Sequence, residues 1–248
     1  MKLAELTWQD VSELPRDVVV LVPTGSLEQH GPHLPLFTDS LLVTAAAEAI
    51  ESKLKDRVLL VPTLWLGCSA HHLPFSGSMT ASFEGYEDAL TNVIESLVAH
   101  GFTKFFVING HGGNSEPNGV ACRRLKAENP DLTFGHSGYF AYIPDSVLES
   151  VLEGPLKKIQ HACEAEASLM LHLYPGLVRK DRLRDDGLKP EPEVRGLAFQ
   201  FDEVTEQGSF GYATQATAEK GKRLFEAAVE GAVKELSALA DGFVLRGI

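Results

Sequence analysis

The sequence predicts a three-layer α/β/α fold, in which helices cover both faces of a mostly parallel central sheet. Strand-like and helix-like segments alternate along the chain. The strand-like segments are nearly continuous apolar runs, as expected of strands that are buried on both faces. Few of the turns have the sequence of a tight hairpin, so helices are expected to connect successive strands. The 248 residues contain no internal repeat and fit one domain spanning residues 1–248.

Four short apolar segments are predicted to be strands. The first, "DVVVLVP", is rich in β-branched residues and ends at a proline, which cannot continue a ladder of hydrogen bonds. The other three have the same apolar character and similar length. The four predicted strands are Asp17–Pro23, Arg57–Pro62, Lys104–Gly110 and Leu132–Ser137.

Five longer segments have apolar residues at helical spacing or helix-ending signals. The first begins at Thr38 or Asp39, either of which could serve as N-cap, and the second ends at Gly101. The five predicted helices lie within 38–55, 83–101, 114–130, 161–176 and 217–239. The charged, proline-containing segment Arg179–Gly196 is interpreted as a surface loop or a contact between subunits.

Composition excludes several classes of function. A formal net charge of −12 disfavours binding to a nucleic-acid backbone. No apolar run is long enough to span a membrane, and the N-terminal residues become polar too soon for a signal peptide. Three widely spaced cysteines without a CxxC pattern suit reduced thiols, so a cytoplasmic location is expected.

Two polar segments follow predicted strands. "TGSLEQHGPHLPLFTD" leaves the first strand and "NGHGGNSE" leaves the third. Ligand sites in open α/β sheets form beyond the carboxyl ends of strands, so these segments are expected to meet. Their candidate metal ligands are Glu28, His30, His33, Asp39 and His111. Oxygen and nitrogen donors without thiolate suit Zn²⁺, Mn²⁺ or Fe²⁺.

Each of these residues alone has a plainer interpretation. A single loop histidine is most often hydrogen-bonded without further function. Asp39 alone is most simply an N-cap, and "HGGN" alone could cradle a phosphate. The joint occurrence of Glu28, His30, Asp39 and His111 at two strand ends favours a metal site.

A third polar segment, "HACEAEAS", runs from His161 to Ser168. On a helix, His161 and Glu164 would share a face at a spacing of three residues, whereas Glu166 would point away from Glu164. A functional role is therefore expected of His161 and Glu164, while a solvent-exposed face remains an equal alternative for Glu166.

These segments resemble the creatininase family of amidohydrolases. The resemblance rests on "GSLEQHGPHLPLFTD", "NGHGGN" and "HACEAEASLML", in matching order and spacing, and on "HHLPFSGSMT" at His71–Thr80. It covers about Leu6 to Leu177. The resemblance implies a compact α/β/α fold with one or two divalent metal ions per subunit at the strand ends. It also implies that Glu28, His30, Asp39 and His111 are ligands, with Asp39 bridging where two ions bind.

The chain departs from the creatinine-cleaving members at one ligand. Those members have a glutamate two residues after the histidine of the third strand's loop, where this chain has Gly113, and an apolar residue at the position of Glu164. Glu164 is therefore expected to supply the missing carboxylate as a metal ligand, with Glu166 as the alternative helix-borne ligand. The mechanism expected for such a site is that metal-activated water attacks a carbonyl and His161 protonates the leaving nitrogen as a general acid. Glu166 is expected to orient His161 by fixing the tautomer of its ring, or to orient a metal ligand.

Substrate contacts are expected from four further residues, which are His72, Gly112, Gly113 and Tyr139. The backbone N–H groups of the two glycines would stabilise an oxyanion. Tyr139 falls near a tryptophan position of the creatinine-cleaving members, and neither Trp8 nor Trp65 lies in a matching segment. Creatinine itself is thus not the expected substrate.

The expected function is hydrolysis of a C–N bond in a small molecule. The alternatives on the same site are ring-opening hydrolysis or isomerisation of a keto-sugar or cyclitol, deformylation of a formamide, and trimming of a precursor peptide. An alternative of another class is a non-catalytic α/β protein that binds a small molecule. The resemblance also implies a homo-oligomer, such as a hexamer, with no nucleic-acid or membrane partner.

Overall fold

The computed structural model describes residues 1–187 and 197–243, and its centre is a four-stranded sheet with every strand parallel to its neighbours. The strand order is β2-β1-β3-β4. The strands are β1 (Val19–Thr24), β2 (Val58–Leu60), β3 (Lys104–Asn109) and β4 (Thr133–Gly138). The predicted parallel sheet and all four of its strands are confirmed, with ends that differ by one or two residues.

The register of β1 and β3 positions the two polar segments that follow them. Val19 pairs with Lys104 and Thr24 pairs with Asn109, so both strands end at the same level. The Thr24 hydroxyl donates to Asn109 Oδ1 at 3.1 Å across this edge. The loops after β1 and β3 therefore begin side by side, as the sequence predicts.

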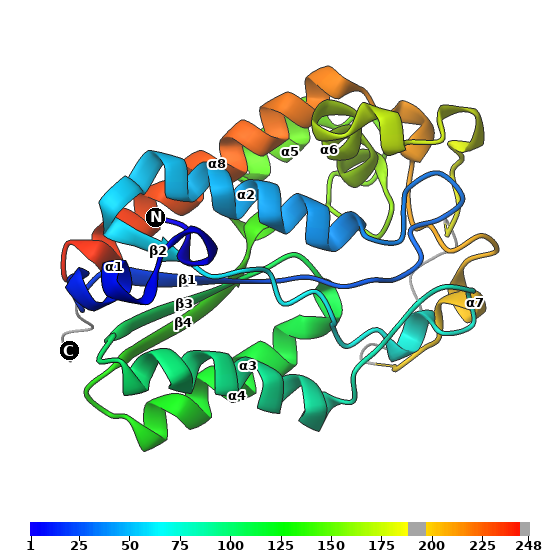
Figure 1. Cartoon of the computed structure of the whole chain (residues 1–248). Coiled ribbons are helices and arrows are strands. Elements are labelled where there is room, and N and C mark those ends of the chain that lie inside the picture. The colour runs from blue at the N-terminus through cyan, green and yellow to red at the C-terminus, as the bar shows by residue number, and fades with distance from the viewer. Residues whose placement is uncertain (188–196, 244–248) are drawn as a thin grey trace, which may run out of the picture.

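Helices cover both faces of the sheet, which gives the three predicted layers (Figure 1). On one face lie α2 (Thr38–Leu54), α5 (Asp145–Val151), α6 (Glu164–Leu173) and α8 (Ala218–Ala240). On the other lie α3 (Phe83–Ala99) and α4 (Ser115–Glu128). Two short helices, α1 (Trp8–Glu13) and α7 (Phe201–Val204), lie outside these layers.

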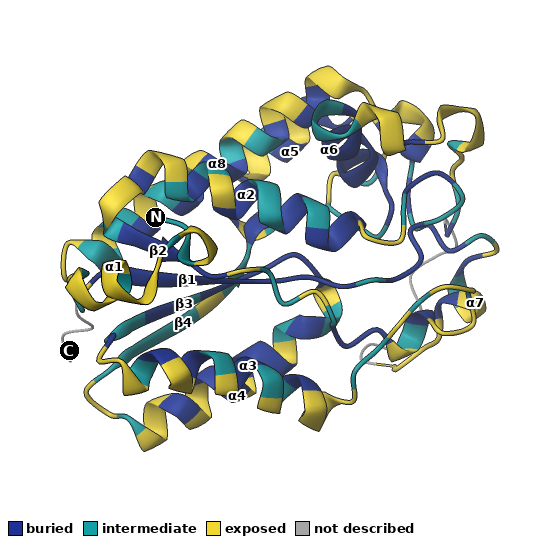
Figure 2. Cartoon of the chain, in the orientation of Figure 1, coloured by how far each residue is buried: buried dark blue, intermediate teal, exposed yellow. Residues whose placement is uncertain are grey.

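The strands are buried on both sides because their residues alternate between two hydrophobic cores. Val19 and Leu21 of β1 pack into the core beneath α2 and α8. Val20 and Val22 pack into the core beneath α3 and α4. Figure 2 shows β1 buried along its length, with the exposed residues of the helices facing outward. This two-sided burial explains why the strands read as continuous apolar runs.

Two helix starts differ from the prediction. The helix expected within 161–176 begins at Glu164, because Ala162 adopts a left-handed conformation with φ of 49° just before it. At α2 the N-cap is Phe37, so neither Thr38 nor Asp39 has that role. In the charged segment 179–196, an exposed 3₁₀ turn forms at Lys180–Arg182, and residues 188–196 lie outside the described part of the chain.

Helix α6, which carries the third polar segment, is held against α8 by a close backbone approach. A Cβ atom added to Gly221 of α8 would lie 1.9 Å from the carbonyl oxygen of Ser168 in α6. Glycine is therefore required where the two helices touch. Every residue of α6 from Glu164 to Leu171 is buried, so the position of this helix is set by its packing.

We predict that Gly221→Ala destabilises the protein by about 1–3 kcal/mol, because the new methyl group must push α8 away from α6. Urea unfolding measures the change. Gly176→Ala is the matched control, since no heavy atom would lie within 4 Å of its Cβ, and its stability should stay within about 0.5 kcal/mol of the parent. Equal stability of the two variants would contradict the prediction.

Candidate active site

Six ionisable side chains from distant parts of the sequence converge beyond the carboxyl ends of β1 and β3. They come from the β1–α2 loop, the first turn of α2, the loop after β3, and the start of α6 with the residues just before it. The six residues are Glu28, His30, Asp39, His111, His161 and Glu166. Among the described residues they form three groups, and in each group one ligand atom per residue lies within 4.8 Å of the others.

Asp39 is shared by two of these groups. Its Oδ2 lies 3.1 Å from His111 Nδ1, which is also 3.2 Å from Glu28 Oε1. Its Oδ1 lies 3.0 Å from His30 Nε2, which is 4.0 Å from Glu166 Oε2. The two oxygens of one carboxylate thus face two separate sets of donors. This is the arrangement expected of an aspartate that bridges two ions.

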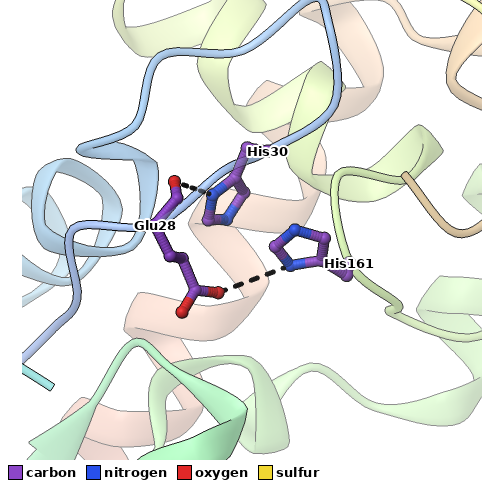
Figure 3. Close-up of side chains that lie close together, drawn as sticks. All are labelled: Glu28, His30 and His161. Carbon is purple, nitrogen blue, oxygen red and sulfur yellow. Dashed lines mark hydrogen bonds and ion pairs between the residues drawn. The ribbon is translucent and has the colours of Figure 1, made fainter. Parts of the chain in front are cut away.

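Three histidines are anchored by a backbone carbonyl on the nitrogen that faces away from the carboxylates. Nε2 of His111 lies 3.0 Å from the Cys68 carbonyl, and Nδ1 of His30 lies 3.2 Å from the Glu28 carbonyl. Nε2 of His161 lies 2.7 Å from the Gln29 carbonyl. The other nitrogen of each ring is left to face the carboxylates. Figure 3 shows the His30 ring on the Glu28 carbonyl and the His161 ring beside the Glu28 carboxylate. Metal-binding imidazoles are typically oriented in this way.

Two buried oxygen atoms indicate that the cluster suits a cation. Within residues 1–187 and 197–243, no group has hydrogen-bond geometry toward Glu28 Oε1 or Asp39 Oδ2, although imidazole nitrogens lie close to both. Burying a carboxylate oxygen without a partner is costly unless a cation balances it. The carboxylate and imidazole donors fit a divalent ion such as Zn²⁺ or Mn²⁺.

The charges in the cluster shift each other's pKa values. Burial lowers the pKa of His30, but Asp39 with Glu166 and Glu28 more than reverses this and raises it to about 9. Burial also raises the pKa of Glu166 to about 7, against the attraction of His30. The His30 ring is therefore protonated on both nitrogens at neutral pH when no metal is bound. A metal ion that binds through His30 must displace this proton.

Glu164 does not join the cluster, so its prediction as a metal ligand is wrong. Its carboxylate accepts hydrogen bonds from the backbone N–H groups of Glu153 and Gly154, at 2.8 and 2.9 Å, and from Lys220 Nζ at 2.7 Å. Glu166 occupies the expected place instead, within the group that contains His30 and Asp39. The helix begins at Glu164, and two residues further along a helix the side chain points to the opposite side.

His161 lies at the cluster, but the expected partner of its ring is different. Its Nδ1 is 3.6 Å from Glu28 Oε1, and its Nε2 is held by the Gln29 carbonyl. The Glu166 carboxylate accepts instead from the backbone N–H of Ala162. The expectation that Glu166 orients His161 is therefore wrong. His33, also buried, has its Nε2 2.9 Å from the Ala162 carbonyl and belongs to none of the groups.

A cavity of about 330 Å³ opens over the cluster. Of the four predicted substrate contacts, His72, Gly112 and Gly113 line it. Tyr139 does not line it and lies in the hydrophobic core with 2% of its surface exposed, so its prediction as a substrate contact is wrong, and Phe140 lines the cavity in its place.

Sequence reasoning missed the apolar wall of this cavity, which consists of Phe140, Ile159, Phe199 and Phe201 and is called the aromatic wall below. These residues lie in irregular segments or a very short helix, where no periodic pattern marks them. It also missed Gln29, although the residue lies between two predicted ligands in "EQH". Its side chain contacts His72 and His161.

The geometry of the loop after β3 explains why position 113 is a glycine. A Cβ atom at this position would lie 2.4 Å from the Cys68 carbonyl oxygen and 2.5 Å from His111 Nε2. The loop after β3 therefore has no room for a side chain here, and it cannot provide the carboxylate that a glutamate would bring. Glu166 of α6 is the carboxylate that completes the second group.

The family model described as creatinine amidohydrolase matches residues 4–236. The chain belongs to the creatininase family. It is 32% identical to a mycofactocin precursor peptide peptidase of Mycobacterium ulcerans, with 97% of this chain and 93% of the relative covered. It is 30% identical to a creatinine amidohydrolase of Pseudomonas putida, with 92% and 93% covered. Like these relatives, the chain is a creatininase-family hydrolase.

Solved structures support the same fold. A mutant creatininase of Zn–Zn type is 29% identical and superposes with a TM-score of 0.80, covering 94% of this chain and 96% of the other. A creatininase with Mn is 28% identical with a TM-score of 0.81 over the same shares of both chains. Zinc and manganese, the metals of these two creatininases, both suit the carboxylate and imidazole groups of this chain.

We predict that Glu166→Gln and Glu164→Gln separate metal binding from stability. Glu166→Gln should lower the amount of bound Zn²⁺ per chain, because it removes a donor beside His30 and Asp39. Glu164→Gln should keep the parent metal content but lose on the order of 1–3 kcal/mol of stability, because Lys220 is left buried without its full counter-charge. Elemental analysis and urea unfolding measure the two effects. The opposite pattern would restore Glu164 as the ligand.

Proposed function

We propose that the protein is a metal-dependent amidohydrolase that cleaves the C–N bond of an amide carrying an apolar group beside that bond. One observation supports this most directly. The shared carboxylate of Asp39, with its two sets of donors, lies at the base of a cavity that has an aromatic wall. Family membership disfavours the alternative of a non-catalytic binding protein.

Two sets of residues would hold the metal ions. Glu28, Asp39 and His111 form one set, and His30, Asp39 and Glu166 form the other. A divalent cation bound here would supply a Lewis acid that polarises a carbonyl and lowers the pKa of water. The protein provides the buried, low-dielectric setting in which such polarisation is strongest.

His161 is suited to transfer a proton from the attacking water to the leaving nitrogen. Burial, helped by His30 and His72, lowers the pKa of its ring well below the usual value, so the ring is neutral at physiological pH. The Gln29 carbonyl takes the Nε2–H group, which leaves the lone pair of Nδ1 facing Glu28. Nδ1 can accept a proton from water and then donate it to the leaving nitrogen.

The aromatic wall supports an apolar substrate group. Phe201 lies against the imidazoles of His72 and His161, with ring centroids 4.0 and 4.7 Å away, and Phe199 lies 5.8 Å from Phe201. Burying an apolar side chain against such a wall stabilises a complex by about 1.5–3 kcal/mol. Trp8 and Trp65 are 78% and 42% exposed and do not line the cavity. Similarity to a precursor peptide peptidase is consistent with an amide of this kind.

The activity test uses the Zn²⁺-loaded protein with blocked dipeptides that carry aromatic, aliphatic or acidic side chains, and with creatinine. We predict fastest cleavage of the aromatic or aliphatic dipeptides, with one ¹⁸O atom from labelled water in the new carboxylate. Asp39→Ala should abolish cleavage. Phe199→Ala should raise KM for the aromatic dipeptide about tenfold and leave the acidic one unchanged. Conversion without ¹⁸O would indicate an isomerase, and creatinine as the best substrate would contradict the apolar group.

We further propose that the chain forms a homo-oligomer in the cytoplasm. The edge strand β4 is only half-buried and borders a hollow of about 710 Å³, whose lining includes Phe134, Leu236 and Leu239. An uncovered strand edge beside apolar side chains favours pairing with another chain. The three cysteines are free and buried, in keeping with a reducing compartment. No helix among the described residues has the length and apolar character needed to cross a membrane.

Light scattering after size-exclusion chromatography tests the assembly. We predict a mass that is a multiple of the 26.9 kDa chain, with six copies as the form that the family resemblance suggests. Leu239→Glu should shift the protein toward smaller species, because it places a charge in the apolar hollow. Glu230→Gln on the exposed side of α8 is the control and should leave the mass unchanged. A parent protein of 26.9 kDa in solution would contradict the proposal.

A further inference from the structure

The side chain of Gln29 is almost fully buried, with 5% of the residue exposed, and its amide contacts Gly31, His72, His161 and Gly208 at the edge of the cluster. We propose that Gln29 is a positioning residue that holds His72 as an Nε2–H donor facing the metal site, so that His72 is not a metal ligand. The assignment of the ring's proton rests on hydrogen bonds alone, whereas its use in catalysis rests on the proposed hydrolase function.

The hydrogen bonds determine which way the Gln29 amide faces. Its Oε1 accepts from the backbone N–H of Gly31 at 2.9 Å. Its Nε2 donates to the backbone carbonyl of Gly208 at 2.8 Å. Turning the amide around would place an N–H against an N–H and an oxygen against an oxygen. The Nε2 atom therefore faces the histidines, and it brings only donors.

The amide nitrogen has two hydrogen atoms and three neighbours. The Gly208 carbonyl and His72 Nδ1 both lie at 2.8 Å, whereas His161 Nε2 lies at 3.1 Å. His161 Nε2 also lies 2.7 Å from the Gln29 backbone carbonyl, to which it donates. The two amide hydrogens therefore go to Gly208 and His72. His72 Nδ1 must accept, so the proton of the neutral ring lies on Nε2.

The position of the ring proton on Nε2 distinguishes His72 from the three anchored histidines. Each of those has a carbonyl on its outer nitrogen, which leaves the inner nitrogen free to bind a cation. His72 has an amide donor on its outer nitrogen, so its inner nitrogen, Nε2, carries the hydrogen. That Nε2 lies 3.1 Å from Glu28 Oε1. His72 accordingly presents an N–H group, not a lone pair, at the edge of the cavity, and it belongs to none of the three potential metal groups.

The segment that follows α7 can reach the Gln29 amide because it has a glycine at the point of contact. Gly208 has φ of +87°, and a Cβ atom there would lie 1.9 Å from Gln29 Oε1. The segment after α7 can therefore approach the Gln29 side chain only with glycine at this position. Phe201, at the start of α7, stacks on the His72 ring. The same connection thus fixes Gln29, His72 and one part of the aromatic wall. In the proposed reaction, the His72 N–H is placed to stabilise negative charge on a substrate oxygen.

Nuclear magnetic resonance of the Zn²⁺-loaded, ¹⁵N-histidine-labelled protein tests the proposal, with the His72 signals assigned by their loss in His72→Gln. In the parent, long-range ¹H–¹⁵N correlations should show His72 with the proton on Nε2. In Gln29→Glu, the new carboxylate can only accept, so the proton should move to Nδ1. The exposed substitution Gln9→Glu makes the same change of charge elsewhere and should leave the His72 signals unaltered. If Gln29→Glu does not fold, Gln29→Met removes the donor and should give a mixture of both tautomers.

A parent protein with the His72 proton on Nδ1 would overturn the proposal, and so would unchanged His72 signals in a folded Gln29→Glu variant. The kinetic arm uses the best blocked dipeptide. Gln29→Met should lower kcat on the order of 10²-fold, with KM within about threefold and Zn²⁺ content unchanged. A loss of Zn²⁺ in step with activity would assign Gln29 to metal binding and overturn the positioning role. If no dipeptide is cleaved while the tautomer behaves as expected, only the proposed function fails.

Discussion

The rest of the site depends on one buried carboxylate, that of Asp39, being held between His30 and His111. Asp39 has 2% of its surface exposed, and both rings lie within 3.1 Å of its oxygens. A buried carboxylate is costly unless nearby positive charge and hydrogen bonds compensate for it. Because the two rings come from the loops after β1 and β3, the compensation requires both strand ends to be in register. The sheet topology and the chemistry are therefore linked through this contact.

Local patterns in the sequence were sufficient to predict the strands and four residues of the cluster. Apolar runs marked the four parallel strands, and polar segments at two strand ends marked Glu28, His30, Asp39 and His111, which the structure brings together. The assignment of the helix-borne carboxylate failed for a local reason as well. The helical pattern was extended back to His161, but the left-handed Ala162 separates that residue from α6. A single left-handed residue of this kind does not show in the spacing of apolar residues. It nevertheless alters which side chains share a face.

Tyr139 and the aromatic wall could not be predicted because they depend on contacts between distant segments. Tyr139 and Phe140 are neighbours in sequence, yet the first faces the core and the second faces the cavity. Phe201 lies against the imidazoles of His72 and His161, which come from distant parts of the sequence, and Phe199 lies against Phe201. The motifs of the family resemblance contain Glu28, His30, Asp39 and His111 of the cluster, and also His72, Gly112 and Gly113 of the cavity. They do not contain the apolar wall, whose residues lie between the motifs.

The two glutamates of α6 show how the same helix serves stability and chemistry. Glu164 and Glu166 are both buried in the first turn, and a helix places them on opposite sides. Glu164 faces Lys220 of α8, which neutralises it, and its remaining lone pairs take two backbone N–H groups. Among the residues that the structure describes, the charged neighbour of Glu166 is the imidazole of His30, at 4.0 Å, and not a lysine or arginine. Since Gly113 leaves no room for a carboxylate in the β3 loop, Glu166 would be the acidic group available to a second cation. Glu164 is neutralised by Lys220 and holds α6 against α8.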